Sequence, residues 1–518
     1  MGDDTENARD GLHSVTRGTL ILLLGTLGYV AANFVARVIL VRNLSKGEFD
    51  EFYIALTLAG LLTALGQVGL PQAVARSIPY ASSPEERRAI VRTGFLVTVP
   101  LAICAGAVLF GLSIPISQRY GSPLLGLTLE YFGIAVASSI VSSQVAAVFQ
   151  GFEDVKPATI NQILTPALFI TFLVTLGGSG PWGVPLGYTG ALIAYVLANV
   201  VSLGALVVYY RSRLPRILPA GPRLPEASRR LLLFAFPLFL VGVFSFLSGS
   251  VDTLLLGFYH NNEAGSYGAA LSLARLLLVG LGALGYILLP VVTRLVRNRD
   301  QSSAKIVYGT ATKWMILTSL PLFLVFFLYP GPSLGFVYKA SYAQTTAPLQ
   351  ILLLGAFVST LIGPASAVQI SFGETQALLV NTVIAAAADG VIGLLLIPSM
   401  GIVGAAIAWT TASALLPILS IAELAWSYGL HPFLPHYLIP VLVTGIPAGV
   451  LLGLLPFIPS AWMLPVIVLL LAGTYLLVII LTRSIDRGDR LLLDAIERLL
   501  GRRLPGVRRV ARYFPPRD

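Results

Sequence analysis

The sequence predicts an all-α polytopic membrane protein with 14 transmembrane helices, organised as two pseudo-symmetric six-helix lobes plus two extra C-terminal helices. Its composition, the placement of its positive charges and an internal repeat lead to this prediction. Of the 518 residues, 56% are hydrophobic and only 11% are charged, whereas an ordinary globular protein is about a quarter charged. Apolar runs of roughly 20 residues recur between short polar segments, and a helix of that length crosses a bilayer core of ~30 Å.

The apolar runs place the helices in order along the chain. An acidic, polar arm covers residues 1–17, and the apolar run after it is too long for a cleaved signal peptide, so it is kept as the first helix. The predicted N-lobe, residues 18–210, holds helices at 18–41, 50–75, 92–113, 125–150, 157–177 and 187–210. The predicted C-lobe, residues 231–427, holds helices at 231–258, 265–292, 306–329, 344–371, 376–397 and 402–427. Two further helices are expected within residues 436–482, at 436–456 and 462–482.

Positive charge sets the expected topology. With the N-terminus taken as cytoplasmic, 27 of the 34 lysines and arginines fall on the cytoplasmic side, four fall on the opposite side and three lie within helices. Because positive charge accumulates on the cytoplasmic side of membrane proteins, this asymmetry predicts a multi-pass protein of the plasma membrane with both termini cytoplasmic. The net charge of +10 is therefore explained by topology, and no nucleic-acid partner is expected.

Two pairs of segments indicate an internal repeat. EFDEFYIALTL from Glu48 aligns with EAGSYGAALSL from Glu263 at an offset of 215 residues. GYTGALIAYVLA from Gly187 aligns with GIVGAAIAWTTA from Gly401 at six of twelve positions, at an offset of 214 residues. Chance similarity between apolar stretches is the alternative, but the matching places and offsets favour duplication. Each half begins in the cytoplasm, so the repeat is parallel, and a cavity is expected between the lobes.

The remaining segments are basic. Residues 211–230 carry six arginines and four prolines, which predicts a stiff cytoplasmic linker between the lobes. Residues 483–518 begin with an amphipathic stretch and end in an arginine-rich tail, which suits anionic lipid head groups or serves as a topology signal only.

The sequence motifs do not support disulfide, zinc or nucleotide chemistry. The single cysteine, Cys104, supports neither a disulfide nor a zinc cluster, and the four histidines show no metal-ligand spacing. No lysine follows a glycine, so there is no Walker A loop. The segment from Gly280 to Gly285 matches G-x-G-x-x-G, but it lies within an apolar helix and favours close helix packing. No metal or cofactor is expected.

The candidate functional residues are charges within helices, which cost roughly 2.5 to 3.5 kcal/mol each at a helix centre. Arg37 and Asn33 share one face of the first helix, one turn apart. Arg37 and Arg275 are candidates for binding phosphate, because a guanidinium fork matches it well. Asp252 lies at a similar depth to Arg275, and the two form either a structural ion pair or a switch in which a cation replaces the arginine.

Two further acids are candidates for ion coupling. Asp389 is the deepest acid, on a helix rich in alanine and glycine, and is expected to line the cavity. Glu130 is expected either to take part in coupling or to extend to the outer surface. With Asp252, these acids would bind Na⁺ or H⁺.

Three segments carry a resemblance to a known family: RVILVRNLSKGEFDEFYIALTLAGLLTALGQVGLPQAVAR, FPLFLVGVFSFLSGSVDTLLLGFYHNNEAGSYGAALSL and IPSMGIVGAAIAWTTAS. They resemble polysaccharide biosynthesis flippases, the O-antigen and lipid-linked oligosaccharide branch of the multidrug/oligosaccharidyl-lipid/polysaccharide exporter superfamily. The similarity covers about residues 15–427. The two extra helices resemble those of fourteen-helix lipid flippases, in which they form a lipid groove.

The resemblance implies a transporter that is not an enzyme. It would move a polyprenyl- or dolichyl-pyrophosphate-linked oligosaccharide from the inner to the outer leaflet by alternating access, with cavity arginines holding the anionic linkage. By position these arginines are Arg37 and Arg275. The alternatives are a drug/cation antiporter of the same superfamily and a membrane glycosyltransferase or polymerase.

Overall fold

The computed structural model describes residues 25–433 apart from 153, 155, 178–185, 214–224 and 248, together with residue 473. Helices make up almost all of this part of the chain, and it holds no β-strand. The predicted arm 1–17, the extra helices within 436–482 and the tail 483–518 lie outside the described residues, apart from residue 473.

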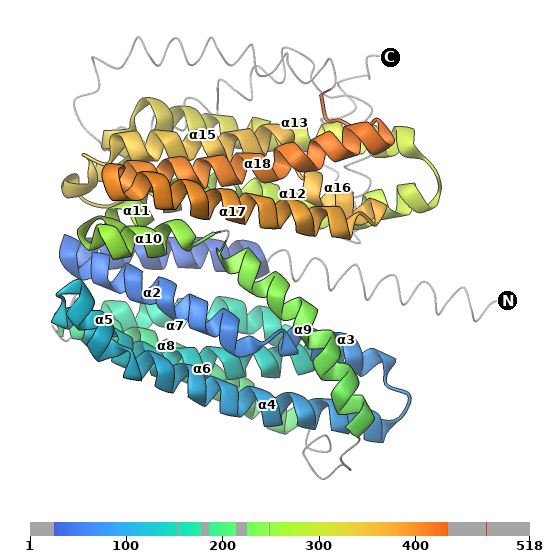
Figure 1. Ribbon diagram of the computed structural model, residues 1–518, viewed down its shortest axis with the longest axis horizontal. Helices are drawn as coiled ribbons and strands as arrows, with labels where there is room; N and C mark the ends of the chain where they lie inside the picture. The colour runs from blue at the N-terminus through green and yellow to red at the C-terminus, as the bar shows by residue number, and fades with distance from the viewer. Residues whose placement is uncertain are drawn as a thin grey trace. The chain divides into compact units, whose positions relative to one another are not determined.

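The described helices follow the predicted order closely (Figure 1). After a first helix at Gly25–Asn43 come α2 to α8, with bounds Lys46–Gln67, Leu70–Tyr80, Pro84–Gly111, Ser113–Tyr120, Pro123–Gly151, Lys156–Leu176 and Gly187–Arg213. The next are α9 to α12, with bounds Pro225–Leu247, Val251–Tyr259, Ala264–Leu276 and Val279–Arg297, and the 3₁₀ turn η1 at Asn261–Glu263. The last are α13 to α18, with bounds Gln301–Leu328, Pro330–Val337, Thr346–Ile362, Ala365–Phe372, Thr375–Met400 and Ile402–Tyr428, and the turn η2 at Ala340–Tyr342.

Within the described residues, ten helices are long and apolar enough to cross a membrane, or up to eleven if one bent pair forms a single span. The prediction of an all-helical, multi-pass membrane protein is thus confirmed. The total of fourteen helices stays a prediction.

Four predicted helices are interrupted. The helix expected at 50–75 ends at Gln67 and resumes at Leu70, because Val68 and Gly69 both adopt the left-handed conformation with φ of 46° and 67°. Glycine is required at 69 for a second reason, since a Cβ there would collide with the carbonyl of Ala235 on α9. The helices expected at 231–258 and 265–292 are likewise each divided in two.

The fourth interruption lies within the helix expected at 344–371. Helices α15 and α16 are bent by 40° across Gly363 and Pro364. Pro237, Pro321 and Pro417, by contrast, lie inside helices that continue through them. Proline alone therefore does not break these helices, and the added left-handed glycine at 363 accounts for the difference.

The linker expected at 211–230 is shorter than predicted. Residues 211–213 belong to the last turn of α8, and α9 begins at Pro225 rather than near 231. Proline is favoured at the first position of a helix, because its missing N–H has no partner there in any case. Residues 214–224 lie outside the described residues.

The chain divides into two compact units. The first unit comprises Leu24–Gly268 and Gly393–Ala405, and its central element is α6. This helix packs against α2, α3, α4, α5, α7 and α8, and seventeen of its 29 residues are buried. Its apolar and its small polar residues are distributed around the whole helix, so it has no single hydrophobic face.

The second unit comprises Ala269–Ile392 and Ala406–Asp518, together with Met1–Leu23; in its described part α12 packs against α13 and α16, and α13 packs against α15. Five residues in the buried core of the second unit lie 214 positions after residues in a core cluster of the first unit. The pairs are Val74/Leu288, Ile78/Val292, Ile90/Ala304, Val148/Ile362 and Tyr210/Leu424. Equivalent positions of the predicted repeat therefore form a core in each unit.

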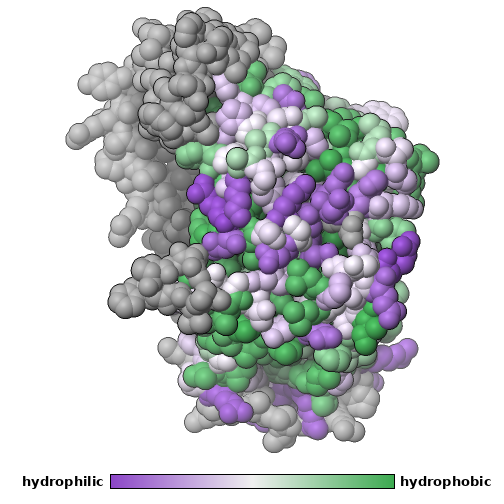
Figure 2. Space-filling view, turned by 90° about the vertical axis from the view of Figure 1, so that its left-hand side faces the viewer, coloured by the Kyte–Doolittle hydropathy of each residue, from purple (hydrophilic) through white to green (hydrophobic). Residues whose placement is uncertain are grey.

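The surface has the polarity expected of a membrane protein, whose helix ends are in contact with water. Figure 2 shows the side on which α5 lies in Figure 1, and hydrophilic residues gather there between hydrophobic ones. Large apolar side chains along the helices are exposed, among them Ile103, Phe110 and Leu395, at 63%, 59% and 71% of their surface. In water such exposure would be costly, whereas lipid accommodates it.

Candidate substrate-binding pocket

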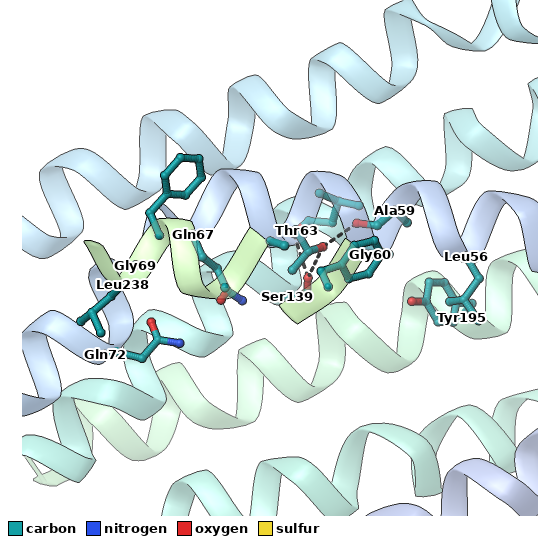
Figure 3. A pocket seen from close by; sticks show the side chains of 16 residues that line it. Leu56, Ala59, Gly60, Thr63, Gln67, Gly69, Gln72, Ser139, Tyr195 and Leu238 are labelled. Carbon is teal, nitrogen blue, oxygen red and sulfur yellow. Dashed lines mark hydrogen bonds between the residues drawn. The ribbon is translucent and has the colours of Figure 1, made fainter. Parts of the chain in front are cut away.

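A pocket of about 400 Å³ lies in the first unit between α2, α6, α8 and α9 (Figure 3). Its sixteen lining residues are Leu56, Ala59, Gly60, Thr63, Ala64, Gln67, Gly69, Gln72, Ala135, Val136, Ser139, Tyr195, Leu238, Phe239, Gly242 and Phe246. None of these sixteen is charged, and five carry uncharged groups that form hydrogen bonds. The lining thus favours a neutral, hydroxyl-bearing ligand over an ion.

The polar wall is built by α2 and α6. Thr63 and Ser139 face each other across the two helices, with their hydroxyl oxygens 3.4 Å apart. One turn further along, the Gln67 Nε2 donates to the Ser143 hydroxyl at 3.1 Å, and Ser143 donates in turn to the carbonyl of Ser139 at 3.0 Å. These bonds fix the Gln67 amide in orientation, and Figure 3 shows Gln72, which belongs to α3, near Gln67.

An aromatic cluster forms the opposite end of the pocket. The Tyr195 ring on α8 lies 4.4 Å from that of Phe132, 5.5 Å from that of Phe169 and 6.0 Å from that of Phe52, measured between ring centroids. Tilted and edge-to-face pairs of this kind hold the rings rigidly. A rigid ring beside hydroxyl and amide groups can accept the apolar face of a sugar while its hydroxyls are hydrogen-bonded.

A contact between the two predicted repeats lies in the same unit. The buried carboxylate of Asp50 on α2 accepts a hydrogen bond from the backbone N–H of Gly265 on α11, at 2.6 Å. One turn along both helices, the Tyr53 ring packs against Gly268, where an added Cβ would lie 2.5 Å from the Tyr53 Cζ. Residues 50 and 265, and residues 53 and 268, are each 215 apart, which is the offset of the predicted repeat. Equivalent positions of the two repeats therefore meet here.

Arg37 and Asn33 lie on the first helix of this unit. The Arg37 guanidinium lies over the ring of Tyr53, 5.2 Å from its centroid, so it lies beside the contact between the repeats. Asn33 is exposed, and its amide donates to the carbonyl of Tyr29 at 2.9 Å. Neither residue is among those that line the 400 Å³ pocket.

Two predicted acids also belong to the first unit. Asp252 is fully buried and accepts hydrogen bonds from the Tyr267 hydroxyl and, at 2.7 Å, from the backbone N–H of Thr253. Glu130 is partly buried and accepts a hydrogen bond from the Ser113 hydroxyl at 3.5 Å. Asp252 is therefore held in place by its neighbours, as a buried charge must be.

The other two candidates belong to the second unit. Arg275 is exposed, and Asp389 is fully buried on α17. The proposed pairing of Asp252 with Arg275 joins residues of different units and stays a prediction.

Reasoning from charge missed the uncharged residues that line the pocket: Thr63, Gln67, Gln72, Ser139 and Tyr195. The spacing of Gln67 and Gln72 around Gly69 was the available signal, because a helix break carries polar side chains beside unsatisfied backbone groups.

Fold and site define a multi-pass membrane protein with a pocket of uncharged polar, apolar and aromatic side chains between its helices. The polysaccharide biosynthesis protein family matches residues 15–296, more than half of the chain, and the chain belongs to this family. The predicted family membership is thus confirmed.

Individual relatives are more distant. Stage V sporulation protein B of Bacillus subtilis (strain 168) is 25% identical over 206 residues, which are 38% of this chain and 39% of that protein. The solved structure of the lipid II flippase MurJ in an inward closed conformation is similar with a TM-score of 0.72 at 15% identity, covering 90% of this chain and 99% of that one. An inward-facing multidrug resistance MATE family transporter of the MOP superfamily gives a TM-score of 0.62 at 17% identity, covering 80% and 97%. The chain thus has the fold of MOP superfamily transporters.

Proposed function

We propose that this protein is a flippase that moves a polyprenyl- or dolichyl-pyrophosphate-linked oligosaccharide from the inner to the outer leaflet. The observation that carries the proposal is the chemistry of the pocket, in which amide and hydroxyl groups face a rigid tyrosine ring. Sugars present this combination of hydroxyl groups and apolar faces. Family membership and the likeness to a lipid II flippase support the same substrate class.

Transport by alternating access is part of this proposal. In a twofold-related pair of repeats, equivalent residues touch each other only near the axis. The contacts of Asp50 with Gly265 and of Tyr53 with Gly268 support such an axis between two six-helix repeats. Packing of α9 and α10 against α2 belongs to the same contact, and helices packed in this way can shift against each other as rigid bodies.

The charged residues complete the proposed mechanism. Arg37, beside the contact between the repeats, and Arg275 would bind the pyrophosphate of the carrier lipid. Asp252, Asp389 and Glu130 would couple transport to Na⁺ or H⁺, with Asp252 best placed because its hydrogen bonds fix its carboxylate. The predicted orientation puts both termini in the cytoplasm.

The test is flipping of a fluorescent lipid-linked oligosaccharide by the purified protein in liposomes. We expect Arg37→Ala and Arg275→Ala each to lower the rate by about tenfold or more, because each removes a charge-assisted contact with phosphate. The matched control is Arg119→Ala, which removes an exposed arginine outside the pocket. Wild-type flipping rates in both variants would refute the proposal.

A drug/cation antiporter is the second candidate, favoured by the likeness to MATE transporters and by buried Asp252. The neutral pocket disfavours it, since a cationic drug is normally held by acids. A drug-efflux assay in the same liposomes separates the two functions: efflux without flipping would establish the antiporter.

A further inference from the structure

A second pocket, of about 320 Å³, lies where α3, α4 and α9 meet in the first unit. Its lining residues are Arg76, Ser77, Tyr80, Ala81, Glu86, Ile90, Arg230, Leu231 and Phe234. Two arginines and one glutamate are the charged members of this set, so the lining is net positive. Tyr80 has 80% of its surface exposed, and an exposed tyrosine is typical of a membrane–water interface.

Arg76 is held in position by an aromatic ring. Its guanidinium carbon lies 4.1 Å from the centroid of the Phe234 ring. Stacking occupies the flat face of a guanidinium and leaves the N–H donors at its edge directed sideways. Such an edge can donate two parallel hydrogen bonds to a phosphate group.

Glu86 does not cancel the positive charge of the pocket. One of its carboxylate oxygens accepts a hydrogen bond from the backbone N–H of Ser82 at 2.8 Å, at the start of α4. The other is paired with Arg230 through a single contact of 3.4 Å, and the Arg230 side chain is 71% exposed. An exposed, long ion pair of this kind is weak, so Arg230 can exchange it for a phosphate.

The second pocket continues into the first along two helices. On α3, Gln72 lines the first pocket and Arg76, one turn later, lines the second. On α9, Leu238 lines the first pocket and Phe234, one turn earlier, lines the second. Residues four apart lie on one face of a helix, so the two pockets are lined by neighbouring positions on the same faces of α3 and α9.

We propose that, before the carrier pyrophosphate reaches Arg37 and Arg275, the second pocket binds the phosphate-bearing headgroup of a lipid and holds it beside the sugar-binding first pocket. The proposal rests on the proposed function in one respect, that the first pocket receives the glycan. The phosphate chemistry is shared by a pyrophosphate carrier lipid and by an anionic phospholipid. The predicted topology puts Arg76 and Arg230 on the cytoplasmic side, where a flippase of this kind loads its substrate.

The experiment measures binding to the purified full-length protein in a neutral detergent by calorimetric titration. The probes are farnesyl pyrophosphate, short-chain phosphatidylglycerol, inorganic pyrophosphate and, as the phosphate-free control, farnesol. The variants are Arg76→Gln with Arg230→Gln, and Arg87→Gln as a matched control, because Arg87 is an exposed arginine on α4 outside the lining. Arg76→Lys keeps the charge and removes the stacked fork.

We expect farnesyl pyrophosphate to bind the double variant about 10- to 100-fold more weakly, and to bind the Arg87→Gln protein with unchanged affinity. Arg76→Lys is a milder change and serves as the test if the double variant does not fold. This variant is expected to bind farnesyl pyrophosphate several-fold more weakly than the wild type. An equal loss for phosphatidylglycerol supports the phosphate site and identifies ordinary phospholipid as a ligand, whereas a loss confined to farnesyl pyrophosphate identifies the carrier lipid.

Unchanged affinity for every phosphate probe in the double variant, or in Arg76→Lys if only that variant folds, would overturn the proposal. Binding is measured without transport. A failure of the flipping assay would therefore leave this result standing, and a failure here would leave the first pocket and the proposed function intact.

Discussion

Removing the carboxylate of Asp50 should open the contact between the repeats. The Asp50 carboxylate is 2% exposed and accepts the Gly265 N–H at 2.6 Å. Asp50→Ala leaves the buried Gly265 N–H without its acceptor, which costs about 1 to 3 kcal/mol, so it is expected to shift the balance between closed and open states by about 5- to 150-fold. Asp50→Asn keeps an acceptor without its charge and should give a smaller shift in the same direction.

Cysteine labelling measures this shift. The native cysteine, Cys104, is first replaced by alanine because it is exposed and would react. Ser266→Cys then introduces a thiol beside Gly265, at a position that is only 4% exposed. Maleimide labels this thiol only when the contact opens, so Asp50→Ala should raise the labelling rate about fivefold or more.

The control is Glu51→Ala, which removes the neighbouring acid of α2. A labelling rate at residue 266 that is the same with and without the Asp50 carboxylate would show that the hydrogen bond does not hold the contact closed. A rise of equal size with Glu51→Ala would show that general loosening of α2, rather than this bond, exposes the site.

Three further predictions concern the pocket, packing and a helix cap. Gln67→Leu should lower the flipping rate of reconstituted protein several-fold while the melting temperature stays within a few degrees, because it removes the amide from the wall but keeps its size. Gly268→Ala should lower the free energy of unfolding by about 1 to 3 kcal/mol in denaturant titration, because the new methyl group meets the Tyr53 ring. The N–H and hydroxyl groups of Ser303 lower the pKa of Asp300, the N-cap of α13. The stabilisation is therefore present above the ordinary aspartate pKa of about 3.9 and is lost as the pH falls through the lower folded value. Asp300→Ala should accordingly lower the melting temperature at pH 7, and this difference should shrink below about pH 4.

The fold was predictable because a bilayer imposes one strong rule, that apolar runs of sufficient length become helices. All twelve predicted helices before residue 428 coincide with described helices or helix pairs. Their interruptions were less predictable. The break at residues 68 and 69 depends on the close passage of α9 over Gly69, a tertiary contact that no local pattern reveals.

The candidate site was predictable only in part. A search for charges finds Arg37 and Asp252, because a charge within a membrane helix needs an explanation. It cannot find Gln67 or Ser139, since uncharged polar residues are common in membrane helices and most of them bond to their own backbone.

The proposed twofold axis would explain why the two predicted repeats differ where they meet. At a twofold axis an unchanged duplicate would face itself, so position 50 would oppose a second buried aspartate and position 53 a second tyrosine. Two buried carboxylates would repel each other, and two rings could not occupy the space that one fills. The chain has an acid opposite a glycine N–H and a ring opposite a glycine surface, so each pair has a large and a small member. If the repeats arose by duplication, divergence at the proposed axis is thus a physical requirement of joining the two copies. A sequence comparison of the repeats should find its largest size differences at the positions that meet.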